Sequence, residues 1–206
     1  MEQISYPVSL LVEGPTDEAV VRRILAYVGL PCGAVYGKKG KDDLLRRLPR
    51  YNRAARFAPW LAVVDLDREP ECAPLLVRSV LPDPAPAMNL RVAVRAIESW
   101  LLADAERMAR FLSIPAKRIP ADPDALADPK AFLVNLARHS QRRAIREEMV
   151  PRAGSGARVG PGYTRRIIEF VNAEDGWRPK VAERHSDSLR RCVACLRALK
   201  EWRPDF

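Results

Sequence analysis

The chain has 206 residues, of which 48% are hydrophobic and 30% charged, which is typical of a folded domain with one sizeable core and excludes a largely disordered chain. No apolar run approaches the roughly 20 residues that span a bilayer, and the N-terminus lacks the basic-then-apolar order of a signal peptide. We therefore expect a cytoplasmic protein with no membrane partner, whose four unevenly spaced cysteines remain thiols.

The net charge of +9 is concentrated toward the C-terminus. Residues 1–130 carry 19 Lys and Arg against 17 Asp and Glu, a net +2, whereas residues 131–206 carry 16 against 9, a net +7. This arginine density favours contact with a nucleic-acid backbone, with Arg142, Arg143 and Arg146 as candidates. A solvated helix surface in an arginine-rich proteome explains the same residues equally well.

The first half of the chain alternates predicted strands and helices. Apolar runs predict strands at 7–13, 33–36, 60–67 and 90–97. Apolar periodicity predicts helices at 16–28, with Thr16 as the N-cap, at about 41–50, and from residue 98 to 112. This alternation indicates an α/β fold with a mainly parallel sheet and right-handed crossovers.

The strand signal stops near residue 113. A proline-punctuated connection leads to helices predicted at 129–138, 140–149, 163–173 and 186–201, with a flexible loop at 151–163. We expect a core at 1–112 and a helical, arginine-rich part at 113–206 that packs on it as one structural unit. Cys192 and Cys195 lie on the apolar face of the last predicted helix, which favours core packing over a zinc or redox site.

Acidic residues follow several of the predicted strands. Glu13 closes the first strand, Asp65 and Asp67 close the third, Glu98 follows the fourth, and Asp17 begins the helix that leaves the first. The carboxyl ends of parallel strands form the ligand-binding edge of an open sheet, so we expect these acids to gather there. Crowded carboxylates repel one another unless a cation lies between them, and all-oxygen ligation favours Mg²⁺ or Mn²⁺.

Each acid taken alone also has a purely structural interpretation. Asp17 and Glu18 suit the positive end of a helix dipole, Asp65 and Asp67 suit a turn, and Glu98 suits a helix start. Taken together these interpretations weaken, because the same coincidence would have to recur at three strand ends.

A lysine-rich loop, GKKGK, follows the second predicted strand. Lys38, Lys39 and Lys41 would lie on the same sheet edge as the acids, where they could hold a phosphate; a solvated loop is the alternative. The loop lacks the spacing of a Walker A motif, so we do not expect ATP hydrolysis by this chain.

The segments VEGPTDEAVV and VVDLDRE resemble the TOPRIM domain of topoisomerases, bacterial primases and OLD-type nucleases, over about residues 5–112. With IESWLLAD and HSDSLRRC added, nearly the whole chain is similar to a bacterial family of small TOPRIM-like proteins, a domain of unknown function often associated with defence ATPases. The resemblance implies a TOPRIM-like four-stranded sheet flanked by helices, with a helical C-terminal extension.

The same resemblance implies a role for each acid. Glu13 would be a metal ligand and a candidate general acid or base, Asp65 and Asp67 the metal-binding pair, Asp17 an additional acid, and Glu98 a ligand for a second metal. Glu13 and Asp65 are the catalytic candidates.

A metal-dependent phosphodiesterase acting on DNA or RNA is the function that these residues favour. No tyrosine stands in a topoisomerase context, and the chain is too short for a topoisomerase or a full primase. A nucleic-acid-binding accessory protein, non-catalytic or dependent on a separate ATPase, is the alternative. A phosphatase with Asp65 as nucleophile is disfavoured, because such enzymes carry Thr or Val where this chain has Glu69.

Overall fold

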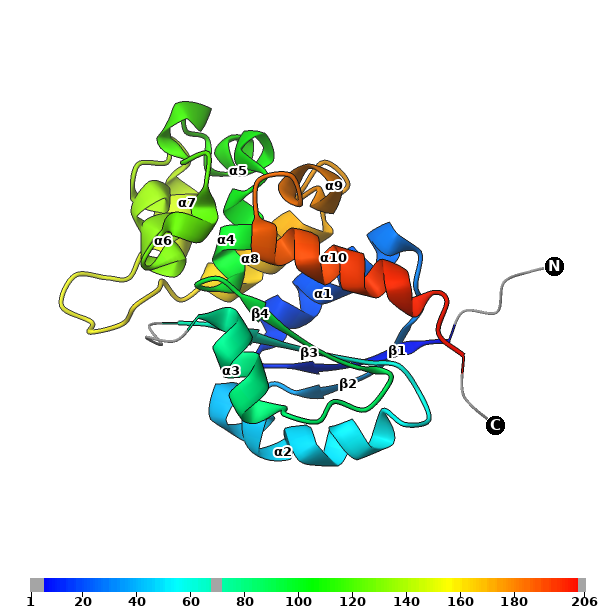
Figure 1. Cartoon of the computed structure of the whole chain (residues 1–206). Coiled ribbons are helices and arrows are strands. Elements are labelled where there is room, and N and C mark those ends of the chain that lie inside the picture. Colours follow the sequence, from blue (N-terminus) through cyan, green and yellow to red (C-terminus); the bar gives the residue numbers. More distant parts are fainter. Residues whose placement is uncertain (1–5, 68–71, 204–206) are drawn as a thin grey trace.

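A four-stranded, all-parallel sheet lies between two layers of helices in the computed structural model, which describes residues 6–67 and 72–203 (Figure 1). Its strands follow the order β2-β1-β3-β4: β1 (Val8–Val12), β2 (Cys32–Gly37), β3 (Trp60–Asp65) and β4 (Met88–Ala93). The two central strands are therefore β1 and β3, and β2 and β4 are the edges. The α/β class predicted from the sequence is confirmed.

Helices of the first half cover both faces of the sheet. The two faces are covered by α1 on one side and by α2 and α3 on the other (Figure 1). The helices of this half are α1 (Pro15–Val28), α2 (Lys41–Ala54), α3 (Ala73–Val80), α4 (Ile97–Leu102) and α5 (Ala105–Leu112). The carboxyl ends of all four strands lie at one end of the sheet, next to the start of α4.

The second half of the chain is helical, as predicted. In it α8 packs on α1, and α10 packs on both α1 and β4. Its elements are the 3-10 helices η1 (Ala116–Arg118) and η2 (Pro123–Ala125) and the helices α6 (Pro129–Arg138), α7 (Arg143–Met149), α8 (Tyr163–Asn172), α9 (Pro179–Ala182) and α10 (Asp187–Leu199). No helix in the described part of the chain is long and apolar enough to cross a membrane.

Strand residues alternate between two hydrophobic clusters, one on each face of the sheet. Leu61 and Val63 face the cluster that contains α1 and the C-terminal helices, whereas Ala62 and Val64 face the cluster that contains α2 and α3. This alternation follows from the two-residue period of a strand. Because β3 is buried on both faces, its sequence is apolar at every position before Asp65.

Several element boundaries differ from the prediction. Thr16 is not the N-cap of α1: Gly14 is, without a side-chain cap, and Pro15 takes the first helical position, which suits proline. The third strand stops at Asp65, because Asp67 has a left-handed backbone (φ 58°). The prediction omitted α3 and α9, which are eight and four residues long, too short for a clear helical period.

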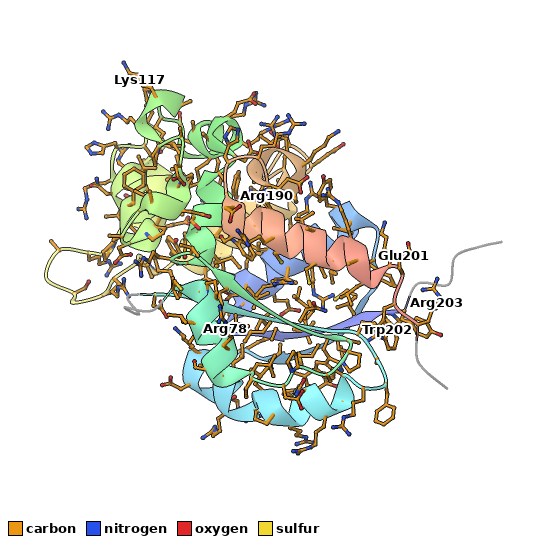
Figure 2. The ribbon with its side chains drawn as sticks, viewed as in Figure 1. Arg78, Lys117, Arg190, Glu201, Trp202 and Arg203 are labelled. Atoms are coloured by element: carbon orange, nitrogen blue, oxygen red, sulfur yellow. The ribbon has the colours of Figure 1, made fainter. Side chains whose placement is uncertain are left out.

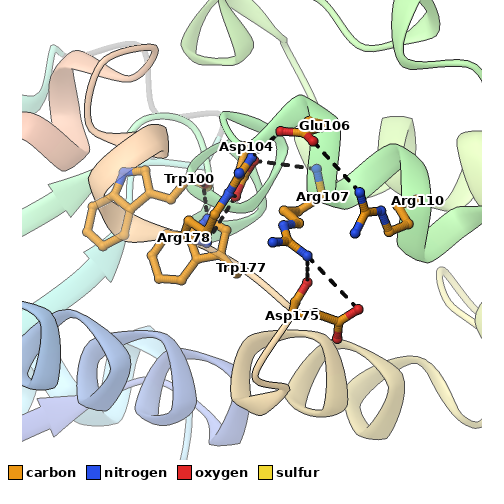
Figure 3. A network of polar contacts seen from close by, with 8 residues as sticks. All are labelled: Trp100, Asp104, Glu106, Arg107, Arg110, Asp175, Trp177 and Arg178. Atoms are coloured by element: carbon orange, nitrogen blue, oxygen red, sulfur yellow. Dashed lines mark hydrogen bonds and ion pairs between the residues drawn. The ribbon is translucent and has the colours of Figure 1, made fainter.

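A polar network joins α4 and the following turn to the C-terminal helices (Figure 3). Trp177 Nε1 donates to the backbone oxygen of Trp100 (3.0 Å), and Trp100 Nε1 donates to Ser188 Oγ (2.7 Å). The buried Asp104 accepts hydrogen bonds from Arg178 N (3.0 Å), Nε (2.9 Å) and Nη2 (2.7 Å). The segments IESWLLAD and HSDSLRRC are therefore in direct contact.

The last helix confirms the core-packing interpretation of its cysteines. Cys192 is fully buried among apolar residues of α10, and burial raises the pKa of its thiol to about 12. Cys195 Sγ lies 2.7 Å from Asn89 Oδ1 on β4, as a hydrogen-bond donor. Both thiols thus contribute to the packing of α10 on the sheet.

Candidate active site at the carboxyl ends of the strands

Glu13 lies directly after β1 and reaches across to β3. Its Oε1 accepts a hydrogen bond from the backbone N of Asp65 (2.8 Å), and its backbone oxygen accepts one from Gly40 N (3.0 Å). Gly37, at the end of β2, passes so close to β1 that a Cβ there would lie 2.3 Å from the oxygen of Val12. Glycine at this point lets the lysine-rich loop close around Glu13.

Two further carboxylates, Asp17 and Asp65, lie beside Glu13, and each is only 7% exposed. Asp65 Oδ1 accepts a hydrogen bond from the backbone N of Ile97 (2.8 Å), which ties the end of β3 to the start of α4. The Asp17 side chain folds back over the turn before α1, since a Cβ on Gly14 would lie 3.2 Å from Asp17 Oδ2. The acids predicted on β3 and α1 are thus brought together.

Glu98 is the most deeply buried of these acids, at 1% exposed, in the first turn of α4. Its Oε1 accepts a hydrogen bond from the hydroxyl of Tyr163 (3.0 Å) and lies 3.4 Å from Lys130 Nζ. Its Oε2 is buried and has no hydrogen-bond partner among the described residues. A buried carboxylate oxygen without a partner is costly, so this atom is a candidate to bind a ligand.

The crowding of these acids changes their ionisation. Burial raises the pKa of Glu13 to about 7, although the hydrogen bond from Asp65 N opposes it. Burial, with the charge of Glu98 adding to it, raises the pKa of Asp17 to about 6 and that of Asp65 well above its usual range. Burial lowers the pKa of Lys130, but Glu98 and Asp65 outweigh it, and the net pKa is raised. The cluster is therefore short of positive charge.

Asp67 lies at the rim of this cluster instead of inside it. Its side chain is 53% exposed and lies 3.3 Å from Lys41 Nζ. Lys38 Nζ is 2.5 Å from Glu18 Oε2, and Arg22 Nε is 2.9 Å from Glu18 Oε1, so Glu18 forms ion pairs with these two side chains. Lys39 is exposed. Glu69, on which the phosphatase comparison depends, lies outside the described residues.

A cleft of about 550 Å³ opens beside Asp65 and Asp67; Glu13, Asp17 and Glu98 do not line it. Both acidic and basic side chains line it: Asp65, Asp67, Asp128, Arg95, Lys130 and Arg158. The predicted phosphate-binding arginines, which lie in α7 and just before its start, do not line this cleft. Arg142 lines a separate pocket, Arg143 pairs with Glu147 (2.7 Å), and Arg146 donates to the oxygen of Ser140.

The donor set of the cluster fits a hard divalent cation, because it consists of carboxylate oxygens without histidine or sulfur. The orphaned Oε2 of Glu98 agrees with this. Within the described residues, however, no three acidic, histidine or cysteine side chains are arranged so that they could together hold a metal ion. Mg²⁺ does not require such a cage, since it commonly keeps several waters and binds through one or two carboxylates.

Sequence reasoning missed the site residues that come from the second half of the chain. Lys130 follows Pro129 at the start of α6, and Tyr163 opens α8; neither lies in a motif. Arg95 and Arg158 were also missed. The sequence carries no signal for Lys130 and Tyr163, because only the docking of α6 and α8 brings them to the sheet. Arg95 differs, since it lies two residues after the end of β4 and its position follows from that strand.

Replacing Glu13 by glutamine should change how stability depends on pH. The folded-state pKa of about 7 exceeds the usual 4.5, so Glu13 favours folding below about pH 4.5 and loses that contribution as pH rises through 7. We expect the stability of Glu13→Gln relative to wild type to increase by about 2 kcal/mol between pH 5 and 8 in EDTA, a value reduced for the partial exposure of Glu13. Urea unfolding at both pH values measures this difference, and an equal difference at both would contradict it.

Comparisons with known proteins leave the family open. No protein-family model matches the chain, and neither a curated protein nor a solved structure matches it.

Proposed function

We propose that this chain is a Mg²⁺- or Mn²⁺-dependent phosphodiesterase that acts on nucleic acid. One observation carries the proposal: the buried carboxylates of Asp17, Asp65 and Glu98 lie near one another and near Glu13, and Lys130 Nζ lies 3.4 Å from Glu98 Oε1. Such an excess of buried negative charge is unfavourable without a cation, and it is the arrangement that a divalent ion stabilises.

One or two of the carboxylates of Glu13, Asp17, Asp65 and Glu98 would bind the ion directly, since no three of them are arranged to hold it together in the described residues; Asp67 lies at the rim. When bound, a divalent cation would lower the pKa of a water and polarise a phosphoryl oxygen. The roles of the protein groups follow from their positions. Asp65 accepts a hydrogen bond from Ile97 N, and Glu13, which is partly exposed and accepts from Asp65 N, is the candidate to accept a proton from the attacking water.

Basic side chains at the cleft complete the proposed site. Lys130, Arg95 and Arg158 line the same cleft as Asp65, where they can hold the phosphates of a substrate. The hydroxyl of Tyr163 donates to Glu98 Oε1 and so fixes the orientation of that carboxylate. The resemblance of the Glu13 and Asp65 segments to TOPRIM nucleases supports the same reaction and the same assignment.

Cleavage assays with the wild-type protein test the proposal. We expect plasmid, single-stranded DNA or single-stranded RNA to be cleaved in Mg²⁺ or Mn²⁺ and to remain intact in EDTA. Binding without cleavage in any metal would instead favour an accessory protein that depends on a separate ATPase. If the protein neither bound nor cleaved any of the three substrates, both functions would be excluded.

A further inference from the structure

A second hollow, the β4 groove, lies alongside the candidate active site. It has a volume of about 760 Å³ and runs over edge strand β4, between α3 and the start of α10. Its apolar wall is formed by Ala73 and Val77 of α3 and by Leu90 and Val92 of β4. This volume falls within the range of about 300–1,000 Å³ that is typical of ligand sites.

Four arginines line the β4 groove: Arg78, Arg91, Arg95 and Arg191. Arg78 is exposed on α3, and the side chain of Arg191 on α10 is 71% exposed. Figure 2 shows Arg78 and Arg190, the neighbour of Arg191, on helices that lie on opposite sides of β4 in this view. Arg91 Nε is buried and has no hydrogen-bond partner among the described residues.

Two acids also line the groove, and both are engaged with their own surroundings. Asp124 accepts hydrogen bonds from Ser186 Oγ (2.9 Å) and Ser188 N (3.1 Å) at the start of α10. Asp187 pairs with Arg190 and Arg191. Four arginines against two aspartates leave the groove with positive charge, which suits an anionic ligand that also has an apolar surface.

The groove and the active-site cleft adjoin at the ends of β3 and β4. Arg95 lines both of them. On either side of it, Val94 faces the groove and Ala96 faces the cleft; likewise, Leu66 lines the groove and Asp67 the cleft. A polymer with a phosphate at the carboxylates would therefore have to pass Arg95 to reach the groove.

We propose that the β4 groove binds a single nucleic-acid strand next to the bond held at the carboxylates, an inference that rests on the proposed phosphodiesterase function. The apolar wall receives the base faces, and the guanidinium groups stack on bases or contact phosphates. Unpaired nucleotides can enter a hollow of this size, whereas the bases of a duplex are stacked inside the helix. The substrate class is therefore single-stranded nucleic acid, or a single-stranded end.

A pair of neighbouring variants tests the groove. Arg191 and Arg190 both lie on α10, both pair with Asp187, and their side chains are similarly exposed (71% and 63%), but only Arg191 lines the groove. In EDTA, we expect Arg191→Glu to weaken binding of a fluorescent single-stranded 12-mer by about tenfold and to make its salt dependence shallower. Arg190→Glu should weaken binding by less than about threefold.

Protection of Cys72 provides a test that needs no substitution. Cys72 is exposed and lines the β4 groove, whereas Cys32 is partly buried and lies on β2. We expect the single-stranded 12-mer to slow the alkylation of Cys72 in the wild-type protein, as measured by mass spectrometry, and to leave that of Cys32 unchanged.

The outcomes separate this inference from the proposed function. Suppose that the protein cleaves in a metal-dependent way, but that Arg191→Glu and Arg190→Glu weaken single-strand binding equally and the 12-mer does not protect Cys72. This result would overturn the proposed role of the β4 groove and leave the phosphodiesterase proposal intact. Single-strand binding that is selectively weakened by Arg191→Glu, without cleavage in any metal, would support the groove and refute the phosphodiesterase. Tighter binding of a blunt duplex than of the single strand would overturn the groove.

Discussion

Replacing Asp65 by asparagine should lower metal-dependent cleavage by about a hundredfold to a thousandfold. Asp65 is buried between Glu13, Asp17 and Glu98, and its charge is the one that β3 carries into the centre of the cluster. Asparagine preserves the shape and an oxygen that can accept from Ile97 N, but it removes the charge that attracts a cation. The loss of several kcal/mol of charge stabilisation corresponds to this rate change.

Initial rates on the best substrate, compared at saturating Mg²⁺, measure the effect. Asp83→Asn is the matched control. Asp83 is exposed and precedes β4, so it lies at the amino ends of the strands, away from the carboxylates, and this substitution should leave the rate unchanged. In EDTA, Asp65→Asn should be at least as stable as wild type near pH 8, since the raised pKa of Asp65 shows that its charge opposes folding. A variant that folds and cleaves at the wild-type rate would remove Asp65 from the site.

Replacing Asp104 by alanine should destabilise the protein by about 3 kcal/mol without a direct effect on the site. Asp104 is fully buried and accepts three hydrogen bonds from Arg178, and its Oδ1 also caps α5 through Arg107 N (Figure 3). Removal of one partner leaves the guanidinium without its buried counter-charge and the helix without its cap. Urea unfolding measures the change.

Glu106→Ala is the control for Asp104→Ala. Glu106 Oε2 also lies 2.7 Å from Arg178 Nη2, but its side chain is 63% exposed. An exposed ion pair contributes little, so this variant should lose less than about 0.5 kcal/mol. Similar losses in both variants would show that burial of Asp104 is not what makes its contact with Arg178 important.

The acids of the candidate site could be predicted because of how a parallel sheet is built. Strands that run in the same direction end at the same edge, so acids such as Glu13 and Asp65 must come close once their strands pair. Glu98 reaches the same place from the first turn of α4, five residues after the last residue of β4, instead of from the strand end. The sequence predicted Asp67 as a member of the buried cluster on the same grounds, yet the backbone of Asp67 is left-handed and its side chain is largely exposed.

The sequence by itself determined the parallel α/β core, since continuous apolar strands and amphipathic helices allow few other ways to bury their surfaces. It also determined that acids stand at the strand ends. Only the tertiary structure decided that Lys130 and Tyr163 face Glu98 and that Arg95 joins the cleft to the β4 groove. Those positions depend on how α6 and α8 dock and how the end of β4 turns into α4. Such long-range packing leaves no periodicity in the local sequence.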